Sequence, residues 1–304
     1  MQISDFYDKY RGNVLELTVG KEGKSVIIGG EGVLPFHAFE GSMARMPLIA
    51  LEVWDAPPPA DWAENLRSHF GDVVDSPVLW AKKCVESYGA DMICLYLASA
   101  AEGGEIDAAA VAGRVKEVVD AVPVPMIVHG IGDKEIDTLL LKEIARTCAG
   151  EGLLLGPLVK DNFQEIAEAA IEYGHSIIAQ SPLDINLAKE LNIKLTKFVP
   201  RDKIVMDPLT SSLGYGLDYS FSMMERLKHV AVGFGDNMMQ MPMLANPGRE
   251  CWRTKEAKEN AQQGILWEAV TTKTMMLGGA NLAIMASPDS MKLVKKMLAQ
   301  YTTS

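Results

Sequence analysis

Eight short apolar runs recur along the chain and leave room for a helix between them. Each carries Gly, Pro, Ser, Asn or Asp at or near its end. Runs without alternation of polar and apolar residues are typical of strands buried on both faces, as in a parallel sheet covered by helices. The runs cover residues 47–55, 91–99, 125–132, 152–158, 176–182, 203–209, 241–247 and 282–288.

The segments between these runs have the periodicity of helices. One apolar stripe keeps all of its side chains on a single helical face. It consists of Val111, Val115, Val118, Val119 and Val122, and Ile166, Ala169, Ala170 and Tyr173 form a similar stripe. Two further segments begin with Ser-Pro, at residues 76–77 and 287–288. This pair supplies an N-cap oxygen and a proline suited to the first helical turn.

The eightfold strand–helix alternation predicts the α/β class and a closed (β/α)8 TIM barrel, with eight βα units over residues 47–304. An open dinucleotide-binding sheet would have a glycine-rich turn between its first strand and a helix. The GGEG sequence at residues 29–32 is instead followed by LPFHAF. We expect the whole chain, 1–304, to form one domain.

Residues 14–30 precede the barrel units and have a different pattern. Two strand-like stretches flank the sequence KEGK, in which Gly23 allows a tight turn. We expect an N-terminal β-hairpin that caps the bottom of the barrel, where its strands begin.

The charge balance excludes nucleic acid as the main ligand. The 304-residue chain has 29 Lys and Arg against 40 Asp and Glu, a formal net charge of −11. A chain of this charge is repelled by a phosphate backbone. No apolar run is long enough to span a membrane, and the first residues do not resemble a signal peptide. We therefore expect a cytoplasmic protein that binds neither nucleic acid nor a membrane.

The cysteines do not have the spacing of a metal site. The two- to four-residue spacing typical of zinc and iron–sulfur ligands does not occur. Isolated cysteines are most often small buried apolar residues. We expect no metal ligands in this chain, so a cluster would belong to a partner. The four are Cys84, Cys94, Cys148 and Cys251.

Polar residues at the ends of the predicted strands are the candidates for function, because barrel enzymes carry their working groups there. No lysine lies inside a predicted strand, which disfavours Schiff-base chemistry. His129 is either a hydrogen-bonded structural residue or a ligand contact. Cys94 lies in mid-strand, which disfavours a nucleophilic pair with His129, and His175 is expected to be structural. We predict no catalytic residue. The strand-end groups are Glu52, Asp55, Ser99, His129, Asp133, Ser181, Asp184, Asn186, Asp207 and Asn246.

Consecutive strand ends in the second half of the chain concentrate carboxylates and amides. These groups can hydrogen-bond a heterocycle or an amide-rich ligand, although Asp and Asn also cap helices and turns. The loop at residues 211–220 places Gly214 and Gly216 around Tyr215. This pattern either allows close approach to a flat ligand or marks an ordinary flexible loop.

Two segments are candidate partner contacts. The first is the Pro-rich segment 56–60 within the long connection 56–77, which we expect to be stiff and extended. The second contains four methionines, which either form an adaptable surface or pack within the seventh strand and the loop before it. These are Met238, Met239, Met241 and Met243.

Several longer segments carry a resemblance to a known family. They are GEGVLPFHAFEG (30–41), PLIALEVWD (47–55), AQSPLDINLAKELNI (179–193), DPLTSSLGYGLDYSFSMMERLK (207–228) and GILWEAVTTKTMMLGGA (264–280). The chain resembles the small subunit of the corrinoid iron–sulfur protein of the acetyl-CoA (Wood–Ljungdahl) pathway. This subunit corresponds to the delta subunit of the archaeal acetyl-CoA decarbonylase/synthase complex. The similarity covers nearly the whole chain and departs from the family pattern at residues 246–257.

The resemblance implies a TIM barrel paired with a large subunit that carries a [4Fe–4S] cluster and a cobalamin-binding domain. In this heterodimer the cobalamin lies between that domain and the top of the small-subunit barrel. The heterodimer receives a methyl group from methyltetrahydrofolate through a separate methyltransferase and delivers it to acetyl-CoA synthase/CO dehydrogenase. The small subunit would shield the cofactor rather than perform acid–base chemistry.

Strand-end position and membership in the matching segments indicate which residues would face the corrinoid. The amide side chains at the edge of a corrin suit carboxylate, amide and hydroxyl partners. The predicted contacts are Ser181, Asp184, Asn186, Asp207, Gly214, Tyr215 and Asn246. One alternative is a pterin-binding methyltetrahydrofolate:corrinoid methyltransferase, in which Asp207 and Asn246 would contact the pterin. Another is a purely structural subunit that never meets the cofactor.

Overall fold

The computed structural model describes residues 3–41, 43–101, 103 and 105–301. Eight parallel strands form a closed barrel in the order β10-β3-β4-β5-β6-β7-β8-β9. Each strand overlaps one of the eight apolar runs, which confirms the predicted (β/α)8 barrel. The strands are β3 (Leu48–Trp54), β4 (Met92–Tyr96), β5 (Met126–His129), β6 (Leu154–Leu158), β7 (Ser176–Gln180), β8 (Ile204–Asp207), β9 (Met243–Ala245) and β10 (Ala280–Met285).

Helices surround the barrel, and their starts follow the predicted capping. The side chains of Ser76 and Ser287 accept hydrogen bonds from the backbone N–H groups of Leu79 and Ser290. The valine stripe of α3 is buried. The outer helices are α2 (Pro77–Glu86), α3 (Ala108–Ala121), α4 (Lys134–Thr147), α5 (Phe163–Glu172), α6 (Ile185–Leu195), α7 (Leu217–Lys228), α10 (Ala261–Gly278) and α11 (Pro288–Leu298).

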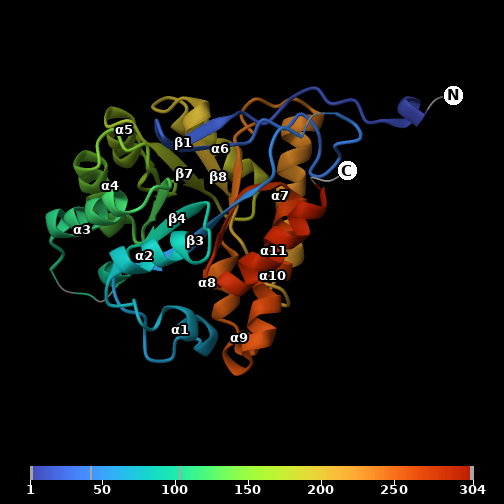
Figure 1. Cartoon of the computed structure of the whole chain (residues 1–304). Coiled ribbons are helices and arrows are strands. Elements are labelled where there is room, and N and C mark those ends of the chain that lie inside the picture. Colours follow the sequence, from blue (N-terminus) through green and yellow to red (C-terminus); the bar gives the residue numbers. More distant parts are fainter. Residues whose placement is uncertain (1–2, 42, 102, 104, 302–304) are drawn as a thin grey trace.

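Three short helices lie at the end of the barrel where the strands finish (Figure 1). They are α1 (Glu64–Phe70), α8 (Pro247–Trp252) and α9 (Lys255–Glu259). The sequence predicted only a stiff, extended connection over residues 56–77, and the structure corrects this by placing α1 within it. Leu66 and Phe70 of α1 are buried, so packing of two apolar residues on one face accounts for this short helix.

The N-terminal hairpin closes the opposite end of the barrel (Figure 1). Strands β1 (Leu17–Lys21) and β2 (Lys24–Ile28) pair antiparallel around the turn that contains Gly23. The backbone N–H of Gly20 donates to the carbonyl of Gly152, just before β6, at 2.7 Å. The buried hairpin side chains join one cluster with the inward-facing residues of the strands. The predicted cap at the barrel bottom is thereby confirmed.

The cysteines and most of the methionine segment contribute to the core. All four cysteines are buried, and burial raises the pKa of each thiol. Met239, Met241 and Met243 are each 1% exposed. These methionines therefore follow the packing interpretation rather than forming a contact surface.

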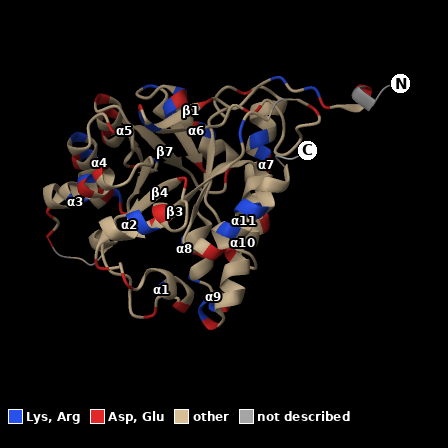
Figure 2. Cartoon of the chain, in the orientation of Figure 1, with Lys and Arg blue, Asp and Glu red and all other residues tan. Residues whose placement is uncertain are grey.

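Charged residues of both signs are mixed on the outer helices. Figure 2 shows Lys and Arg interleaved with Asp and Glu on outer helices such as α3 and α4. Many of these residues form ion pairs, for example Lys142 with Glu165 at 2.6 Å. Over the part of the chain that the structure describes, no helix is both long and apolar enough to cross a membrane.

Candidate binding site at the barrel mouth

The carboxyl ends of six barrel strands, β4 to β9, surround a cavity of about 180 Å³. Parallel strands bring residues that follow them to the same rim of the barrel. His129, Asp207 and Asn246, which the sequence placed at three different strand ends, meet at this cavity. The lining residues are Tyr96, His129, Ile131, Gly132, Pro157, Gln180, Asp207, Leu209, Thr210, Asn246, Arg249, Glu250 and Arg253. We call this cavity the barrel mouth.

His129 presents a hydrogen-bond acceptor to the mouth. Its Nδ1 lies 2.8 Å from the carbonyl oxygen of Gly130, so Nδ1 carries the proton and donates. Burial, reinforced by the positive charge of Arg249, lowers the pKa of His129 to about 3. The ring is therefore neutral near pH 7, and its Nε2 is a lone-pair acceptor. This buried atom has no hydrogen-bond partner among the described residues.

Asp207 is a buried carboxylate whose two oxygens are each bonded once. Oδ2 accepts from the side-chain amide of Gln180 at 2.8 Å, and Oδ1 accepts from the backbone N–H of Leu209 at 2.9 Å. Burial raises the pKa of Asp207, and these hydrogen bonds oppose the shift. Leu209 has a φ of 69°, a left-handed conformation that is rare for residues other than glycine and is found most often at functional sites.

Arg249 is the positive group of the mouth. Its guanidinium lies 4.0 Å from the centroid of the Tyr96 ring. Its Nε lies 2.9 Å from Oε2 of Glu52, and the two side chains are 12% and 2% exposed. The geometry makes an ion pair but not a hydrogen bond, so both atoms keep unused hydrogen-bonding capacity, as does the Nη2 of Arg249. Oε1 of Glu52 accepts from the indole N–H of Trp54 at 2.7 Å.

The backbone of α8 explains why Arg249 reaches the mouth. Pro247 occupies the first helical turn, directly after β9. A Cβ on Gly248 would meet the backbone nitrogen of Ala286 at 2.9 Å, so only glycine lets α8 approach the end of β10 this closely. Arg249 was not among the predicted strand-end residues, because it lies in the segment 246–257 that departs from the family pattern. The sequence feature that could have indicated this arginine is the Asn-Pro-Gly turn directly before it, at the end of a predicted strand.

Two further carboxylates hold the rim without facing a ligand. Asp137 of α4 is fully buried and accepts from the backbone N–H groups of Ile131 and Gly132, both at 2.9 Å. Burial raises its pKa to about 6. Asp55 accepts from the backbone N–H of Ser99 at 2.7 Å and from its hydroxyl at 2.5 Å. These bonds fix the loop after β5 and join the ends of β3 and β4.

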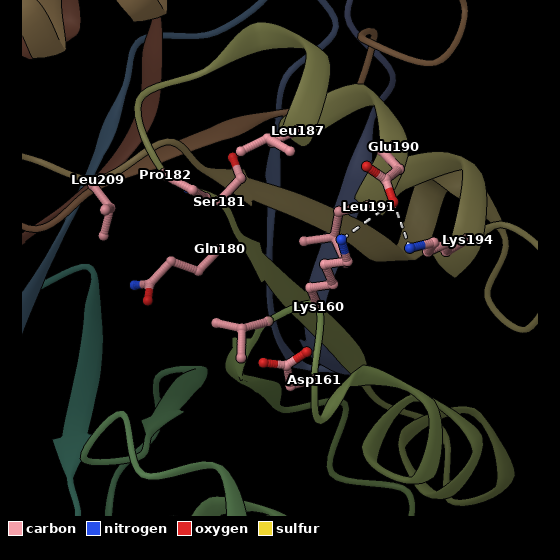
Figure 3. A pocket seen from close by; sticks show the side chains of 11 residues that line it. Lys160, Asp161, Gln180, Ser181, Pro182, Leu187, Glu190, Leu191, Lys194 and Leu209 are labelled. Carbon is pink, nitrogen blue, oxygen red and sulfur yellow. Dashed lines mark hydrogen bonds and ion pairs between the residues drawn. The ribbon is translucent and has the colours of Figure 1, made fainter.

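Ser181 lies beside the mouth rather than within it. It lines a neighbouring cavity of about 270 Å³, which shares Gln180 and Leu209 with the mouth (Figure 3). The backbone N–H of Ser181 donates to the carbonyl of Asp207 at 3.0 Å. Figure 3 shows ion-paired side chains on the far side of this cavity, where Glu190 contacts Lys160 and Lys194.

The remaining predicted contacts lie further from the mouth. Asp184 caps α6 by accepting from the N–H groups of Asn186 and Leu187, at 2.7 and 3.1 Å. Asp184 and Asn186 line a separate hollow against α7 and the helical turn that follows it. Gly214 lines another hollow beside α7. Tyr215 is 54% exposed, and its hydroxyl lies 3.0 Å from Oε2 of Glu256 on α9.

Neither a metal-ligand cluster nor a reactive cysteine–histidine pair is found at the mouth among the described residues. Within residues 3–41, 43–101, 103 and 105–301, no three His, Cys, Asp or Glu side chains gather to hold a metal ion. Cys94 lies in the barrel interior, and burial, reinforced by Glu52, raises its pKa well above the ordinary value. His175 is bonded through both ring nitrogens and is structural, as predicted.

The fold is a closed (β/α)8 barrel similar to that of the dihydropteroate synthases. The dihydropteroate synthase of Xanthomonas albilineans superposes with a TM-score of 0.59 at 12% identity, covering 95% of this chain and 98% of that one. The enzyme of Coxiella burnetii superposes with a TM-score of 0.58 at 12% identity, covering 95% and 100%. At this identity the likeness concerns the fold alone.

The family is established by sequence. The family model for the CO dehydrogenase/acetyl-CoA synthase delta subunit matches residues 16–302, and the chain belongs to this family. It is 35% identical to the acetyl-CoA decarbonylase/synthase complex subunit delta of Archaeoglobus fulgidus, over 96% of this chain and 69% of the relative. The delta subunit of Methanothermobacter thermautotrophicus is also 35% identical, over 96% and 77%. The resemblance seen in the sequence is confirmed, and the methyltransferase alternative is not favoured.

Proposed function

We propose that this chain is the small subunit of a heterodimeric corrinoid iron–sulfur methyl carrier and covers cobalamin with its barrel mouth. The observation that supports this proposal is the set of buried, unpartnered polar atoms at the mouth of a delta-family barrel. Buried polar groups without partners are rare in proteins and cost about 1–3 kcal/mol each. Their concentration at one rim favours a ligand that supplies the missing partners.

The mouth suits a ligand edged with primary amides. An amide offers N–H donors and a carbonyl acceptor. Nε2 of His129 and Oδ1 of Asn246 are buried acceptors, and Nη2 of Arg249 is a buried donor. The acetamide and propionamide groups at the edge of a corrin have this chemistry, so the residues fit cobalamin.

In this role the chain binds and orients but does not transfer protons. His129 stays neutral because of its low pKa, and Asp207 is held by Gln180 and the backbone of Leu209. The rigid rim excludes water from the covered face and fixes the position of the ring. When bound, cobalamin supplies the methyl-transfer chemistry at its cobalt. The seven predicted contacts divide accordingly: Asp207 and Asn246 face the ring, and Ser181, Asp184, Asn186, Gly214 and Tyr215 contact its periphery or the partner.

The other parts of the carrier are assigned to partners. The large subunit carries the [4Fe–4S] cluster and the cobalamin-binding domain. The methyl group comes from methyltetrahydrofolate through a separate methyltransferase and goes to acetyl-CoA synthase/CO dehydrogenase. The relatives are named as subunits of a complex, which supports a role that depends on partners.

The test is to purify the chain alone and together with a candidate large subunit of the carrier. Cobalt content, visible spectra and size-exclusion mass are measured for each. We expect a colourless single chain and a brown, cobalt-containing heterodimer. The paired substitutions His129→Leu and Asn246→Leu should release cobalamin or shift its spectrum, whereas Asn237→Leu, on the exposed loop before β9, should do neither.

Three results would overturn the proposal. Failure to join the large subunit would remove the carrier role. A single chain that binds methyltetrahydrofolate and methylates free cob(I)alamin would be a methyltransferase. A heterodimer whose cobalt content, spectrum and methylation rate are unchanged in the doubly substituted protein would be held together by a purely structural subunit.

A further inference from the structure

A second cavity lies beside the barrel mouth and has a different lining. Its volume is about 310 Å³, within the range of small-molecule sites. Four of the five tryptophans of the chain line it, although they come from β3, from the connection before α1, from α2 and from α8. These are Trp54, Trp62, Trp80 and Trp252. We call this space the tryptophan cavity.

Three of the four rings, those of Trp54, Trp62 and Trp80, form a continuous wall. The ring centroids of Trp54 and Trp62 are 6.4 Å apart, and those of Trp62 and Trp80 are 5.5 Å apart. Trp54 and Trp62 are only partly buried, so their rings are accessible. Such a wall favours a flat, apolar ligand, because aromatic rings stack on each other or meet edge to face.

Two buried donors at this cavity have no acceptor. Arg249 lines both the mouth and the tryptophan cavity, and its Nη2 is unpartnered. Trp80 is 1% exposed, and its indole N–H also has no partner in the described part of the chain. The indoles of Trp54 and Trp252, in contrast, donate to Glu52 and Glu268. A ligand with acceptor atoms would satisfy donors that the fold leaves unused.

The charges around the cavity favour an anion. Three cations line it, of which Arg249 pairs with Glu52 and Lys258 pairs with Asp61 at 2.9 Å. The third, Arg253, reaches Glu250 only at 3.5 Å and is 67% exposed. Glu250 does not line this cavity, so the lining carries one excess positive charge. A guanidinium fork suits the oxygens of a carboxylate or phosphate.

We propose that the tryptophan cavity is a binding site for a planar aromatic ring that carries an oxyanion. The ring lies against Trp62 and its neighbours, and the oxyanion meets Arg253. This site adjoins the corrinoid surface and shares Arg249 and Arg253 with the barrel mouth, but its tryptophan lining does not depend on whether the mouth covers cobalamin. Because Arg249 lines both spaces, a ligand here would also adjust the position of its guanidinium in the mouth.

The test is calorimetric titration of the full chain with 2-naphthoate. Two comparison probes are 2-naphthalenemethanol, which lacks the charge, and cyclohexanecarboxylate, which lacks the aromatic ring. We expect 2-naphthoate to bind at least tenfold more tightly than either. Trp62→Ala should lower the affinity for 2-naphthoate at least tenfold. Trp267→Ala, which removes the one tryptophan outside the cavity, should leave this affinity unchanged.

A surface variant keeps the test decisive if the tryptophan variant folds poorly. Arg253→Glu changes an exposed side chain. It should lower the affinity for 2-naphthoate at least fivefold and leave the affinity for 2-naphthalenemethanol unchanged. Absence of 2-naphthoate binding at millimolar concentration would overturn the proposal, as would equal losses in the Trp62 and Trp267 variants. Loss of 2-naphthoate binding in Asn246→Leu would indicate that the ligand binds in the barrel mouth, and this result would also overturn the proposal. The carrier proposal is tested by the cobalt content of the heterodimer, which this titration does not measure, so the two proposals can fail independently.

Discussion

Two buried histidines lie at opposite ends of the barrel and differ in one respect. At the bottom, His175 accepts from the backbone N–H of Leu153 at 3.0 Å and donates to the carbonyl of Ala145 at 2.9 Å. At the mouth, His129 is bonded through Nδ1 only, and its Nε2 has no partner within the described chain. Burial lowers the pKa of both rings. The histidine at the bottom is therefore fully hydrogen-bonded within the chain, whereas the one at the mouth leaves an acceptor that a bound ligand could use.

The ion pairs of the two ends also differ in the hydrogen bonds that they complete. Near the bottom, Lys228 and Glu31 lie 2.5 Å apart, and Asn281 donates a further hydrogen bond to Glu31 at 2.8 Å. Burial alone would raise the pKa of Glu31, but Lys228 and Asn281 outweigh it and lower the pKa. At the mouth, Arg249 pairs with Glu52 without completing hydrogen bonds. At the bottom, Oε1 of Glu31 accepts two hydrogen bonds and only Oε2 has no partner among the described residues, whereas at the mouth neither atom of the ion-pair contact completes a hydrogen bond.

The largest expected effect is loss of the bottom ion pair. Lys228→Met leaves Glu31 as an unpaired buried carboxylate, and we expect a loss of about 3–5 kcal/mol in the free energy of unfolding. Urea unfolding measures it. The control Lys142→Met breaks an exposed pair and should cost less than about 1 kcal/mol. Equal losses in the two variants would contradict the structural role of the bottom pair.

The second effect concerns Glu268, a buried carboxylate beside the mouth end. It accepts from the indole of Trp252 and from the backbone of Ser287, at 2.9 and 3.1 Å, and burial raises its pKa to about 7. A raised carboxyl pKa means that the folded state holds a proton that the unfolded state has already lost. Stability is therefore lost as pH rises from about 4.5 to about 7, by up to about 3 kcal/mol.

Glu268→Gln should remove this dependence. The variant cannot ionise at this position, so its unfolding free energy should fall less than that of the native chain between pH 5 and pH 8. Urea titrations at four pH values give the difference between the two proteins, in which contributions of other groups cancel. Parallel curves would show that Glu268 has the same pKa in the folded and unfolded states.

The third effect compares the two histidines directly. His175→Leu leaves the N–H of Leu153 and the carbonyl of Ala145 without partners in the core, and we expect a loss of about 2–4 kcal/mol. His129→Leu breaks one hydrogen bond and also removes an unsatisfied acceptor, so its cost should be about 1 kcal/mol or less. Thermal and urea unfolding of both variants test this order. A larger cost at His129 would show that the mouth also serves stability.

The barrel could be predicted from sequence because its signals are local. Unbroken apolar runs indicate strands buried on both faces, and serines before prolines indicate helix starts. The meeting of His129, Asp207 and Asn246 follows from the rule that strand ends share one rim. Local chemistry also explains why Asp184 lies outside the mouth, since its side chain is used by the first turn of α6.

The rest of the site depends on tertiary contacts that no short motif contains. Arg249 reaches Glu52 and Tyr96, which lie more than 150 positions earlier in the sequence. Asp137 has the pattern of an ordinary residue in the first turn of a helix, yet it folds back to hold the loop at Ile131. The tryptophan cavity brings three rings from residues 54–80 together with that of Trp252, which lies more than 170 positions later in the sequence. Such groups can be found only when the closure of the barrel is known.

The smallest expected effect contrasts two asparagines. Asn281, at the start of β10, uses its side chain fully, because Oδ1 accepts from the N–H of Met243 at 3.0 Å and Nδ2 donates to Glu31. Oδ1 of Asn246, at the mouth, is buried without a partner in the described structure. Replacing an unsatisfied polar group by an apolar one of similar shape is close to neutral. Asn246→Leu should therefore change the unfolding free energy by less than about 0.5 kcal/mol, whereas Asn281→Leu should cost about 2 kcal/mol or more.

Urea unfolding of the two variants side by side measures this contrast. A stability loss at Asn246 as large as at Asn281 would mean that its oxygen already has a use in the folded chain, and the case for a ligand at the mouth would then depend on His129 and Arg249 alone.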